Sequence, residues 1–116
     1  MANHSVFYKK SGLSFILFLL CSLLCACAAT TANNAQQTYL LGQRYYQAQN
    51  YGNAFDAINK AAKEGNINAQ YALGYMYYYG IGTGVDPHTG ISWMQKAASK
   101  NQQQAINALA ILNKTR

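Results

Sequence analysis

Side chains that could carry out acid–base or nucleophilic chemistry are scarce in this sequence. No two of them have the spacing of a catalytic pair, of a nucleophile with its base, or of a set of metal ligands. We therefore expect no enzyme activity, no metal and no cofactor. The residues of these types after position 27 are His88, Asp56, Glu64, Asp86, Ser92 and Ser99.

Structural roles account for most of these residues. Asp86 precedes Pro87, and this pair is typical of a helix start, because Asp accepts from free N–H groups and Pro suits the first helical position. His88 follows directly and is expected to be a solvated surface residue. The Gly-Ile-Gly-Thr-Gly run at 80–84 resembles a phosphate-binding loop only weakly. It follows an expected helix and not a strand, so we interpret it as a hairpin loop.

Length and composition limit the chain to one small domain. It has 116 residues and a formal charge of +6, but charged residues make up only 10%, too few for a charge-expanded disordered protein. Ten tyrosines stand against one tryptophan and four phenylalanines. The composition excludes a multidomain enzyme, a collagen-like chain and a coiled coil. The basic residues are scattered, so nucleic-acid binding is not predicted.

The N-terminal residues 1–26 are typical of a signal peptide. Lys9 and Lys10 precede an apolar run over 13–24, which is shorter than the roughly 20 residues of a membrane-spanning helix. The run ends in Leu24-Cys25-Ala26-Cys27, which resembles a bacterial lipobox. The resemblance implies that Cys27 is lipidated and begins the mature protein.

Two other outcomes stay open for this segment. Cleavage at an ordinary A-x-A site, residues 26–28, would release a free periplasmic or secreted protein, and an uncleaved segment would act as an anchor. If Cys27 is lipidated, Ala28 stands where Asp would imply retention at the inner membrane, so the periplasmic side of the outer membrane is expected. All three cysteines lie before residue 28, so the mature domain has no disulfide framework.

The remaining sequence repeats itself. Residues 27–36 are small, polar and uncharged and predict a flexible tether. Residues 39–46 then align with 71–78, 54–62 align with 90–98, and a partial third copy at 105–112 aligns with 69–76. Periods of 32 to 36 residues indicate stacked helix pairs. We predict a repeat domain over 37–113 with about two and a half repeats and helices near 35–49, 53–64, 68–79, 87–99 and 103–113.

Helix ends and packing positions can be predicted from the same pattern. Asn53 and Asn68 are expected to cap the second and third helices, and Gly65 and Asn101 to adopt the left-handed conformation that ends a helix. Glycine inside a helix costs about 1 kcal/mol relative to alanine. Close approach of a paired helix would offset this cost at Gly42 and Gly74, where the third copy has Ala110. The expected core phase holds Leu41, Tyr45, Leu73 and Tyr77.

One unit of the repeat resembles a known family. Residues 69–82, with the Leu73-Gly74 pair, an aromatic run and the Gly80-x-Gly82 loop, are similar to a Sel1-like repeat of the tetratricopeptide superfamily. Asp86, Trp93 and the Lys-Ala-Ala at 96–98, which includes Ala97, extend the match. The resemblance implies an all-α superhelix of helical hairpins that binds proteins or peptides.

On the helix faces opposite the expected core residues, tyrosine and amide side chains form a stripe. Tyrosine provides a large contact area at low entropic cost and also forms hydrogen bonds. We predict a concave groove for a peptide or glycan, although some of these tyrosines could only fill gaps between helices. The predicted groove residues are Tyr39, Gln43, Tyr46, Asn68, Tyr71, Tyr75, Tyr78 and Asn107, and the same stripe includes Gln36, Gln104, Ile111 and Lys114.

The last helix is unusually apolar, because Asn107 is the one polar residue between 105 and 112. Two interpretations stay open: this helix docks on another copy or a partner subunit, or it buries both of its sides within the domain. The predicted function is an exported interaction module or adaptor of the bacterial cell envelope. The alternative function is a weak cell-wall or β-lactam-binding hydrolase, as in cysteine-rich relatives of the repeat family, but this domain lacks their paired cysteines.

Overall fold

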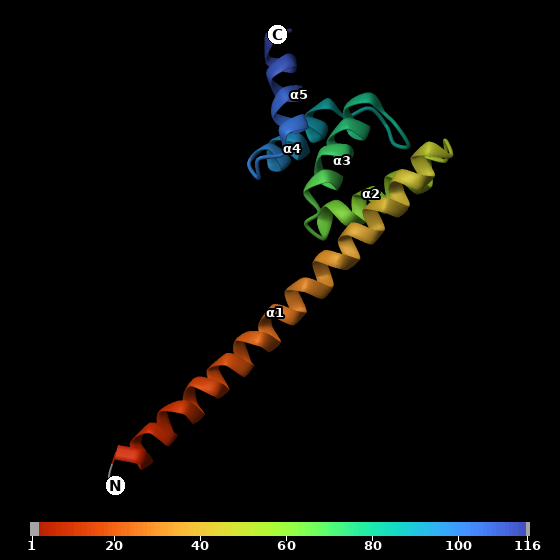
Figure 1. Cartoon of the computed structure of the whole chain (residues 1–116). Coiled ribbons are helices and arrows are strands. Elements are labelled where there is room, and N and C mark those ends of the chain that lie inside the picture. Colours follow the sequence, from red (N-terminus) through yellow and green to blue (C-terminus); the bar gives the residue numbers. More distant parts are fainter. Residues whose placement is uncertain (1–2, 116) are drawn as a thin grey trace. The chain divides into compact units, whose positions relative to one another are not determined.

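The computed structural model describes the backbone of residues 3–115 and the side chains of residues 16–22 and 30–115. All regular structure in these residues is helical, which confirms the all-α prediction. Four of the five helices begin and end within two residues of their expected bounds. The helices are α1 (Asn3–Gln47), α2 (Tyr51–Lys63), α3 (Ile67–Tyr79), α4 (Pro87–Ala98) and α5 (Gln103–Lys114) (Figure 1).

The first helix differs most from the expectation. α1 begins at Asn3 and not near residue 35, so residues 27–36 are helical and do not form a loose tether. The physical reason is composition: this stretch is rich in alanine, the best helix former, and no glycine or proline interrupts residues 13–41. Ala35 is buried and Gln36 accepts a hydrogen bond from Asn66 Nδ2 at 2.8 Å, so both residues take part in the folded domain.

The chain divides into two compact units, residues 1–31 and 32–116. In the first unit the described apolar side chains of residues 16–20 are exposed, and Cys21 has a free, exposed thiol. The side chain of Cys27 lies outside the described residues. None of the helical stretches that the structure describes combines the length and apolar character needed to cross a bilayer.

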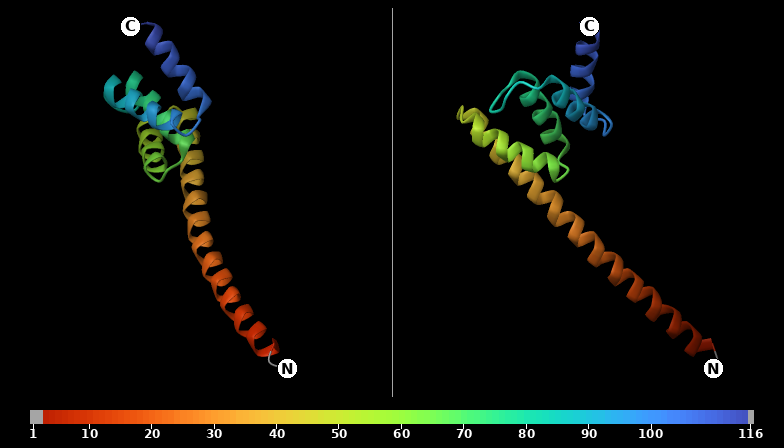
Figure 2. Two further views of the ribbon diagram at one scale, coloured as in Figure 1. Left: turned by 90° about the vertical axis from the view of Figure 1, so that its left-hand side faces the viewer. Right: turned by 180° about the vertical axis from the view of Figure 1, so that it is seen from behind.

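The second unit is built around α3. This helix packs against α2 and α4, and α4 packs in turn against α5 (Figures 1 and 2). At the α2–α3 interface the rings of Phe55 and Tyr77 meet edge to face, with centroids 5.2 Å apart. The core is rich in alanine, which lets the helices approach closely. Its buried members are Ala54, Ile58, Ala61, Ala62, Ala69, Leu73 and Met76.

Two mid-helix glycines lie at the closest helix contacts, as predicted. A Cβ atom on Gly42 would stand 2.6 Å from Cγ1 of Ile58, and one on Gly74 would stand 2.7 Å from the carbonyl oxygen of Gly90. Any larger side chain would therefore push these helices apart. Ala110, the third small residue of the series, is exposed, so the predicted packing role does not apply there.

The prediction of Leu41 as a core residue is wrong. Leu41 is 43% exposed, whereas Leu73 at the equivalent position is fully buried. Leu73 lies in α3, which packs against α2 and α4, whereas the side chain of Leu41 on α1 is left open to solvent. Tyr45 and Tyr77 are partly buried and pack against the core, as expected.

The repeat positions predicted in α4 have the expected structural role. Ala97 is fully buried, and Trp93 packs partly buried against the α2–α3 core. Lys96 places its ammonium nitrogen 5.0 Å from the Trp93 ring centroid, close enough for a cation–π contact. This end of the repeat therefore has a structural role.

Some of the helix starts and ends agree with the sequence prediction. Asp86 accepts a hydrogen bond from the backbone N–H of Thr89 at 3.1 Å and caps α4. Gly65 and Asn101 have positive φ angles, as expected for residues that end a helix. At these three positions the structure confirms the predicted start of α4 and the predicted left-handed residues after α2 and α4.

Two predicted caps are wrong. α2 begins at Tyr51 after Asn50, so Asn53 lies inside the helix, and no side chain caps this end. The cap of α3 is Asn66 and not Asn68, and its Oδ1 accepts from the N–H of Ala69 at 2.9 Å. In both cases the sequence has two asparagines no more than three positions apart, and the position of the preceding turn decides between them.

The glycine-rich loop joins α3 to α4 and forms a hairpin connection. Gly80 ends α3 in the left-handed conformation with φ of 68°, and Gly82 has φ of 69°. A Cβ atom on Gly82 would collide with the carbonyl oxygen of Tyr51, so the loop lies directly against the start of α2. The loop follows a helix and packs on protein, as the interpretation as a hairpin loop requires.

Candidate binding groove

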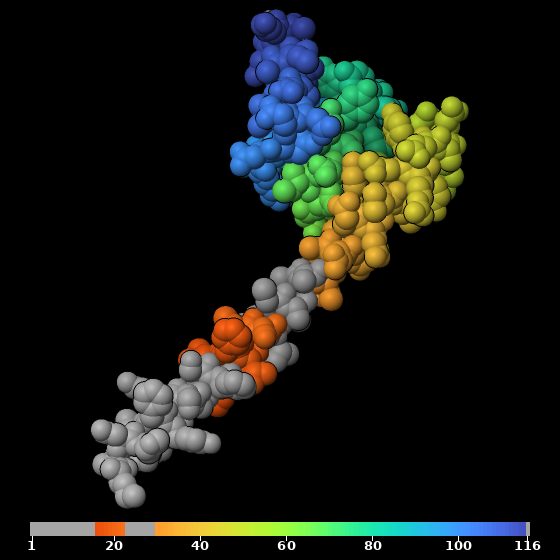
Figure 3. All heavy atoms as spheres, viewed as in Figure 1, coloured from red at the N-terminus to blue at the C-terminus, as the bar shows by residue number. Residues whose placement is uncertain are grey.

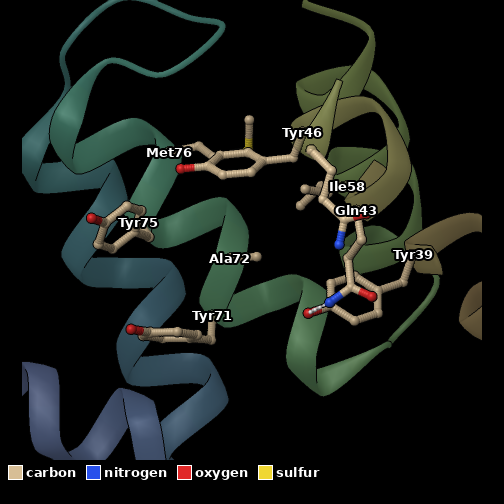
Figure 4. A pocket seen from close by; sticks show the side chains of 9 residues that line it. Tyr39, Gln43, Tyr46, Ile58, Tyr71, Ala72, Tyr75 and Met76 are labelled. Atoms are coloured by element: carbon tan, nitrogen blue, oxygen red, sulfur yellow. Dashed lines mark hydrogen bonds between the residues drawn. The ribbon is translucent and has the colours of Figure 1, made fainter. Parts of the chain in front are cut away.

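A hollow of about 360 Å³ lies between α1 and α3. Figure 4 shows Tyr46 reaching across from α1, while Tyr71 and Tyr75 project from successive turns of α3. The residues around this first hollow are Tyr39, Gln43, Tyr46, Gln47, Ile58, Tyr71, Ala72, Tyr75 and Met76.

The first hollow exists because the residue at the centre of its lining has a small side chain. Ala72 lies between the larger residues in Figure 4 and contributes only a methyl group. Ile58 and Met76 are buried core residues, so their apolar surface forms the base of the hollow. The walls are aromatic and the base is aliphatic.

A hydrogen bond fixes one wall of the hollow. Gln43 Nε2 donates to the phenolic oxygen of Tyr39 at 3.0 Å, between adjacent turns of α1. Burial raises the pKa of Tyr39, and the bond from Gln43 offsets this only in part. Tyr39 therefore stays protonated at neutral pH, and its O–H group can donate.

A second hollow, of about 330 Å³, lies between α3 and α5. It shares Tyr71 and Tyr75 with the first hollow, and we call the two together the tyrosine groove. Ala108 lies here at the repeat position that Ala72 occupies in the first hollow, 36 residues earlier. The lining residues are Tyr71, Tyr75, Tyr78, Tyr79, Met94, Gln104, Asn107, Ala108, Ile111 and Leu112.

The tyrosines of α3 contact one another along the groove. Ring centroids are 4.6 Å apart for Tyr75 and Tyr79 and 5.0 Å apart for Tyr78 and Tyr79. Burial raises the pKa of Tyr71, and the phenols of Tyr75 and Tyr79 raise it further. The groove thus has a line of phenol rings, and a phenol O–H group can donate one hydrogen bond.

No residue that lines either hollow carries a formal charge. The polar lining atoms belong to phenols and to the amides of glutamine and asparagine. No acid, histidine, serine or cysteine lies among them. The groove can therefore bind by ring packing and neutral hydrogen bonds.

The structure brings most of the predicted groove residues together. The first hollow contains Tyr39, Gln43, Tyr46, Tyr71 and Tyr75, and the second adds Tyr78 and Asn107. Asn68 lies in neither hollow. Its Oδ1 accepts a hydrogen bond from Gln102 Nε2 at 3.4 Å, which links the starts of α3 and α5.

Sequence reasoning missed several lining residues. Gln47 and Tyr79 lie one helical turn beyond the predicted Gln43 and Tyr75, so extending the stripe by four residues would have found them. Ala72 and Ala108 share a repeat position, but a small apolar residue gives no signal of a binding site. The other missed residues are Ile58, Met76, Met94 and Leu112.

The residues that could have supported catalysis lie outside the groove. Hydrogen bonds from Thr89 lower the pKa of Asp86, which serves as a helix cap. Among the described residues, no three histidine, cysteine, aspartate or glutamate side chains gather where they could hold a metal ion.

The last helix leaves apolar surface uncovered. Ala105 is the one fully buried residue of α5, while Ile106 is 39% and Ile111 is 64% exposed. In Figure 3 the atoms of α5, in blue, form one edge of the second unit. The alternative that α5 buries both of its sides within the domain is wrong, and docking of α5 on another copy stays a prediction.

Comparison with known proteins shows that part of the second unit is a repeat of a known kind. Residues 67–102 match the Sel1 repeat, and they cover α3, α4 and the turn before α5. A crystal structure of a Sel1 repeat protein from Oxalobacter formigenes is 38% identical, with a TM-score of 0.65. That match covers 67% of this chain and 24% of the other protein.

Two yeast proteins match over 71 residues, or 61% of this chain. One is a chitin synthase regulator of Saccharomyces cerevisiae, at 35% identity, and the other is chitin synthase regulatory factor 3 of Schizosaccharomyces pombe, at 36%. The matches cover 10% and 8% of these proteins. This chain therefore spans about a tenth of the length of the curated relatives that it matches.

Proposed function

Because this chain is a Sel1-like repeat protein, with its Sel1 repeat at residues 67–102, we propose that it is a non-catalytic adaptor that binds a segment of another protein in the tyrosine groove. Sel1 repeats are protein–protein interaction modules. The observation that carries the proposal is that two adjacent hollows share Tyr71 and Tyr75 and are lined by uncharged, partly exposed aromatic side chains.

Tyrosine is well suited to this role. It buries a large area while losing the freedom of only two side-chain torsions, and its O–H group adds a directional hydrogen bond. Tyrosine is also enriched among the residues that contribute most to binding energy at protein interfaces. Tyr75, which is 38% exposed and lies in both hollows, is the residue expected to contribute most.

The hydrolase alternative finds no support in the groove. Its lining offers no carboxylate, histidine, serine or cysteine that could form a nucleophile–base pair. A role in binding needs only the rings and amides that are present.

The proposal includes export and attachment to the bacterial outer membrane through a lipid on Cys27. The supporting features are the basic residues, apolar run and lipobox-like sequence of residues 1–27. Metabolic labelling with a radioactive fatty acid should mark the wild-type protein and not a Cys27→Ala variant. Equal labelling of both proteins, or a free unlabelled protein in the periplasm, would contradict lipidation.

Site-specific crosslinking in the intact cell envelope tests the adaptor role. A photoreactive amino acid replaces Tyr75 in one variant and Tyr51 in a matched control. Tyr51 is 39% exposed, almost the same as Tyr75, but lies outside both hollows. We expect a defined partner to be captured from position 75 and not from position 51.

The captured protein must then bind the purified full chain directly. Tyr71→Ala with Tyr75→Ala should weaken this binding at least tenfold without loss of helical circular dichroism, whereas Tyr51→Ala should leave it unchanged. Equal capture at both positions, or full affinity of the double variant, would place the binding surface elsewhere.

A further inference from the structure

We infer that the segment bound in the tyrosine groove is an uncharged, proline-rich stretch in the extended polyproline II conformation, lying across both hollows. This inference rests on the proposed function, because it names the chemistry of the partner that the same groove binds. Charge, hydrogen-bonding capacity and groove shape each support it.

The first argument is charge. The lining of both hollows is free of charged side chains, and the basic residues of the domain lie outside it. A charged ligand side chain would lose its hydration in the groove without gaining an opposite charge. The ligand that the groove accommodates at least cost is therefore uncharged.

The second argument is hydrogen bonding. Helices line the groove, so it offers no strand edge to pair with the alternating N–H and C=O groups of a β-strand. It offers instead phenol and amide groups that can donate, such as Tyr39, Tyr75 and Gln104. A polyproline II segment has no internal hydrogen bonds, and proline has no N–H, so its free carbonyls need only donors.

The third argument is shape. The groove is divided, because Tyr71 and Tyr75 belong to both hollows, of which one contains Ala72 and the other Ala108. A helical ligand would need one continuous trough for its apolar face. Proline rings are small and can enter separate hollows from an extended chain, and aromatic-lined grooves recognise proline-rich segments in this way. The stiffness of the segment also reduces the entropy lost on binding.

Fluorescence anisotropy with synthetic peptides tests the inference. The probe is a fluorescein-labelled, amidated ten-residue polyproline peptide, titrated with the purified full chain. Peptides of the same length are compared with it: a glycine–serine peptide, a polyproline peptide with two central glutamates, and a neutral amphipathic helical peptide. We expect saturable binding of polyproline and binding at least tenfold weaker for the other three.

Variants then locate the binding. Ala72→Leu and Ala108→Leu each fill one hollow and should weaken polyproline binding about tenfold, whereas Ala110→Leu, on an exposed part of the same helix as Ala108, should not. Tyr75→Phe removes a single O–H group, preserves the ring and should weaken binding several-fold. This variant keeps the test valid if a filled hollow disturbs folding.

The results separate this inference from the proposed function. If polyproline fails to bind while position 75 still captures a protein partner, the adaptor role stands and the inferred ligand is wrong. Preference for the helical or the glutamate-containing peptide, or polyproline binding unaffected by all three groove variants, would likewise overturn the inference.

Discussion

Replacement of Gly74 by alanine should destabilise the domain, although alanine is the better helix former. Gly74 lies in the middle of α3, where this substitution would ordinarily stabilise a helix by about 1 kcal/mol. The added methyl group, however, would stand 2.7 Å from the carbonyl oxygen of Gly90 and 2.8 Å from Cγ of Met94. These distances are shorter than van der Waals contact.

The size of the effect follows from the atoms involved. Overpacking of a well-packed interior costs about 1–3 kcal/mol, and the upper end applies here because backbone atoms of α4 must move. After the gain in helix propensity is subtracted, the free energy of unfolding should fall by about 2 kcal/mol. For a domain of this size, that corresponds to a Tm lower by roughly 10 °C.

Thermal and urea unfolding followed by circular dichroism will measure this change. Gly52→Ala is the matched control, because Gly52 is also helical but has no neighbouring atom within 4 Å of the added methyl group. It should stabilise the domain by up to about 1 kcal/mol. If Gly74→Ala proves as stable as the wild type, the close α3–α4 contact is not as described.

Three further predictions concern the core, a buried amide and a helix cap. Leu73→Ala should lower the free energy of unfolding by about 2–5 kcal/mol, whereas Leu41→Ala should cost about 1 kcal/mol or less; equal losses in urea unfolding would mean that Leu41 is buried. Gln70 is 1% exposed; its Nε2 donates a hydrogen bond to the carbonyl oxygen of Ala62 at 3.2 Å, but its Oε1 has no partner among the described residues. Gln70→Met therefore loses one hydrogen bond and removes one unsatisfied acceptor, so the free energy of unfolding should change by less than about 1 kcal/mol, and a loss of more than about 2 kcal/mol would reveal a missed partner of Oε1. Asp86 has a lowered pKa, so its stabilisation is present above the unfolded-state value of about 3.8 and is lost as the pH falls through the folded-state value. Asp86→Ala should therefore have a lower Tm than the wild type at pH 7 and a similar Tm near pH 2; a constant difference would show that the carboxylate charge is not responsible.

Repetition in the sequence predicted the fold well, because equivalent positions in different repeats are expected to have the same structural role. The spacing of small and apolar residues placed α2 to α5, and the equivalence of Gly42 and Gly74 predicted two close helix contacts. The same equivalence failed at Leu41 and Ala110. Burial depends on whether a neighbouring helix is present, and periodicity within one helix does not contain that information.

Local composition was a poorer guide at the helix starts and in the first helix. Asn50 and Asn53 suit a helix start equally well, as do Asn66 and Asn68, so propensity alone could not choose between them. The stretch at 27–36 was predicted as a tether because it is small and uncharged. Its alanines also favour a helix, and α1 continues through it.

The groove residues were predicted from helical phase, and most of them line the two hollows. Phase identified tyrosines that share a face of α1 and of α3, and five of the predicted residues meet in the first hollow. Helical phase could not predict that Ala72 and Ala108 leave space beside these rings, because the size of a hollow depends on how the neighbouring helices pack. Asn68 shares the phase but lies at the helix start, where it hydrogen-bonds with Gln102.

Hydroxyl-radical footprinting of the full chain with its crosslinked partner tests the central claim most directly. Tyr75 and Tyr51 are 38% and 39% exposed, so mass spectrometry should find them oxidised to similar extents in the free protein. Binding in the tyrosine groove predicts that the partner protects Tyr71 and Tyr75 and leaves Tyr51 as reactive as before. Protection of Tyr51 alone, or oxidation of Tyr71 and Tyr75 that the partner does not change, would contradict it.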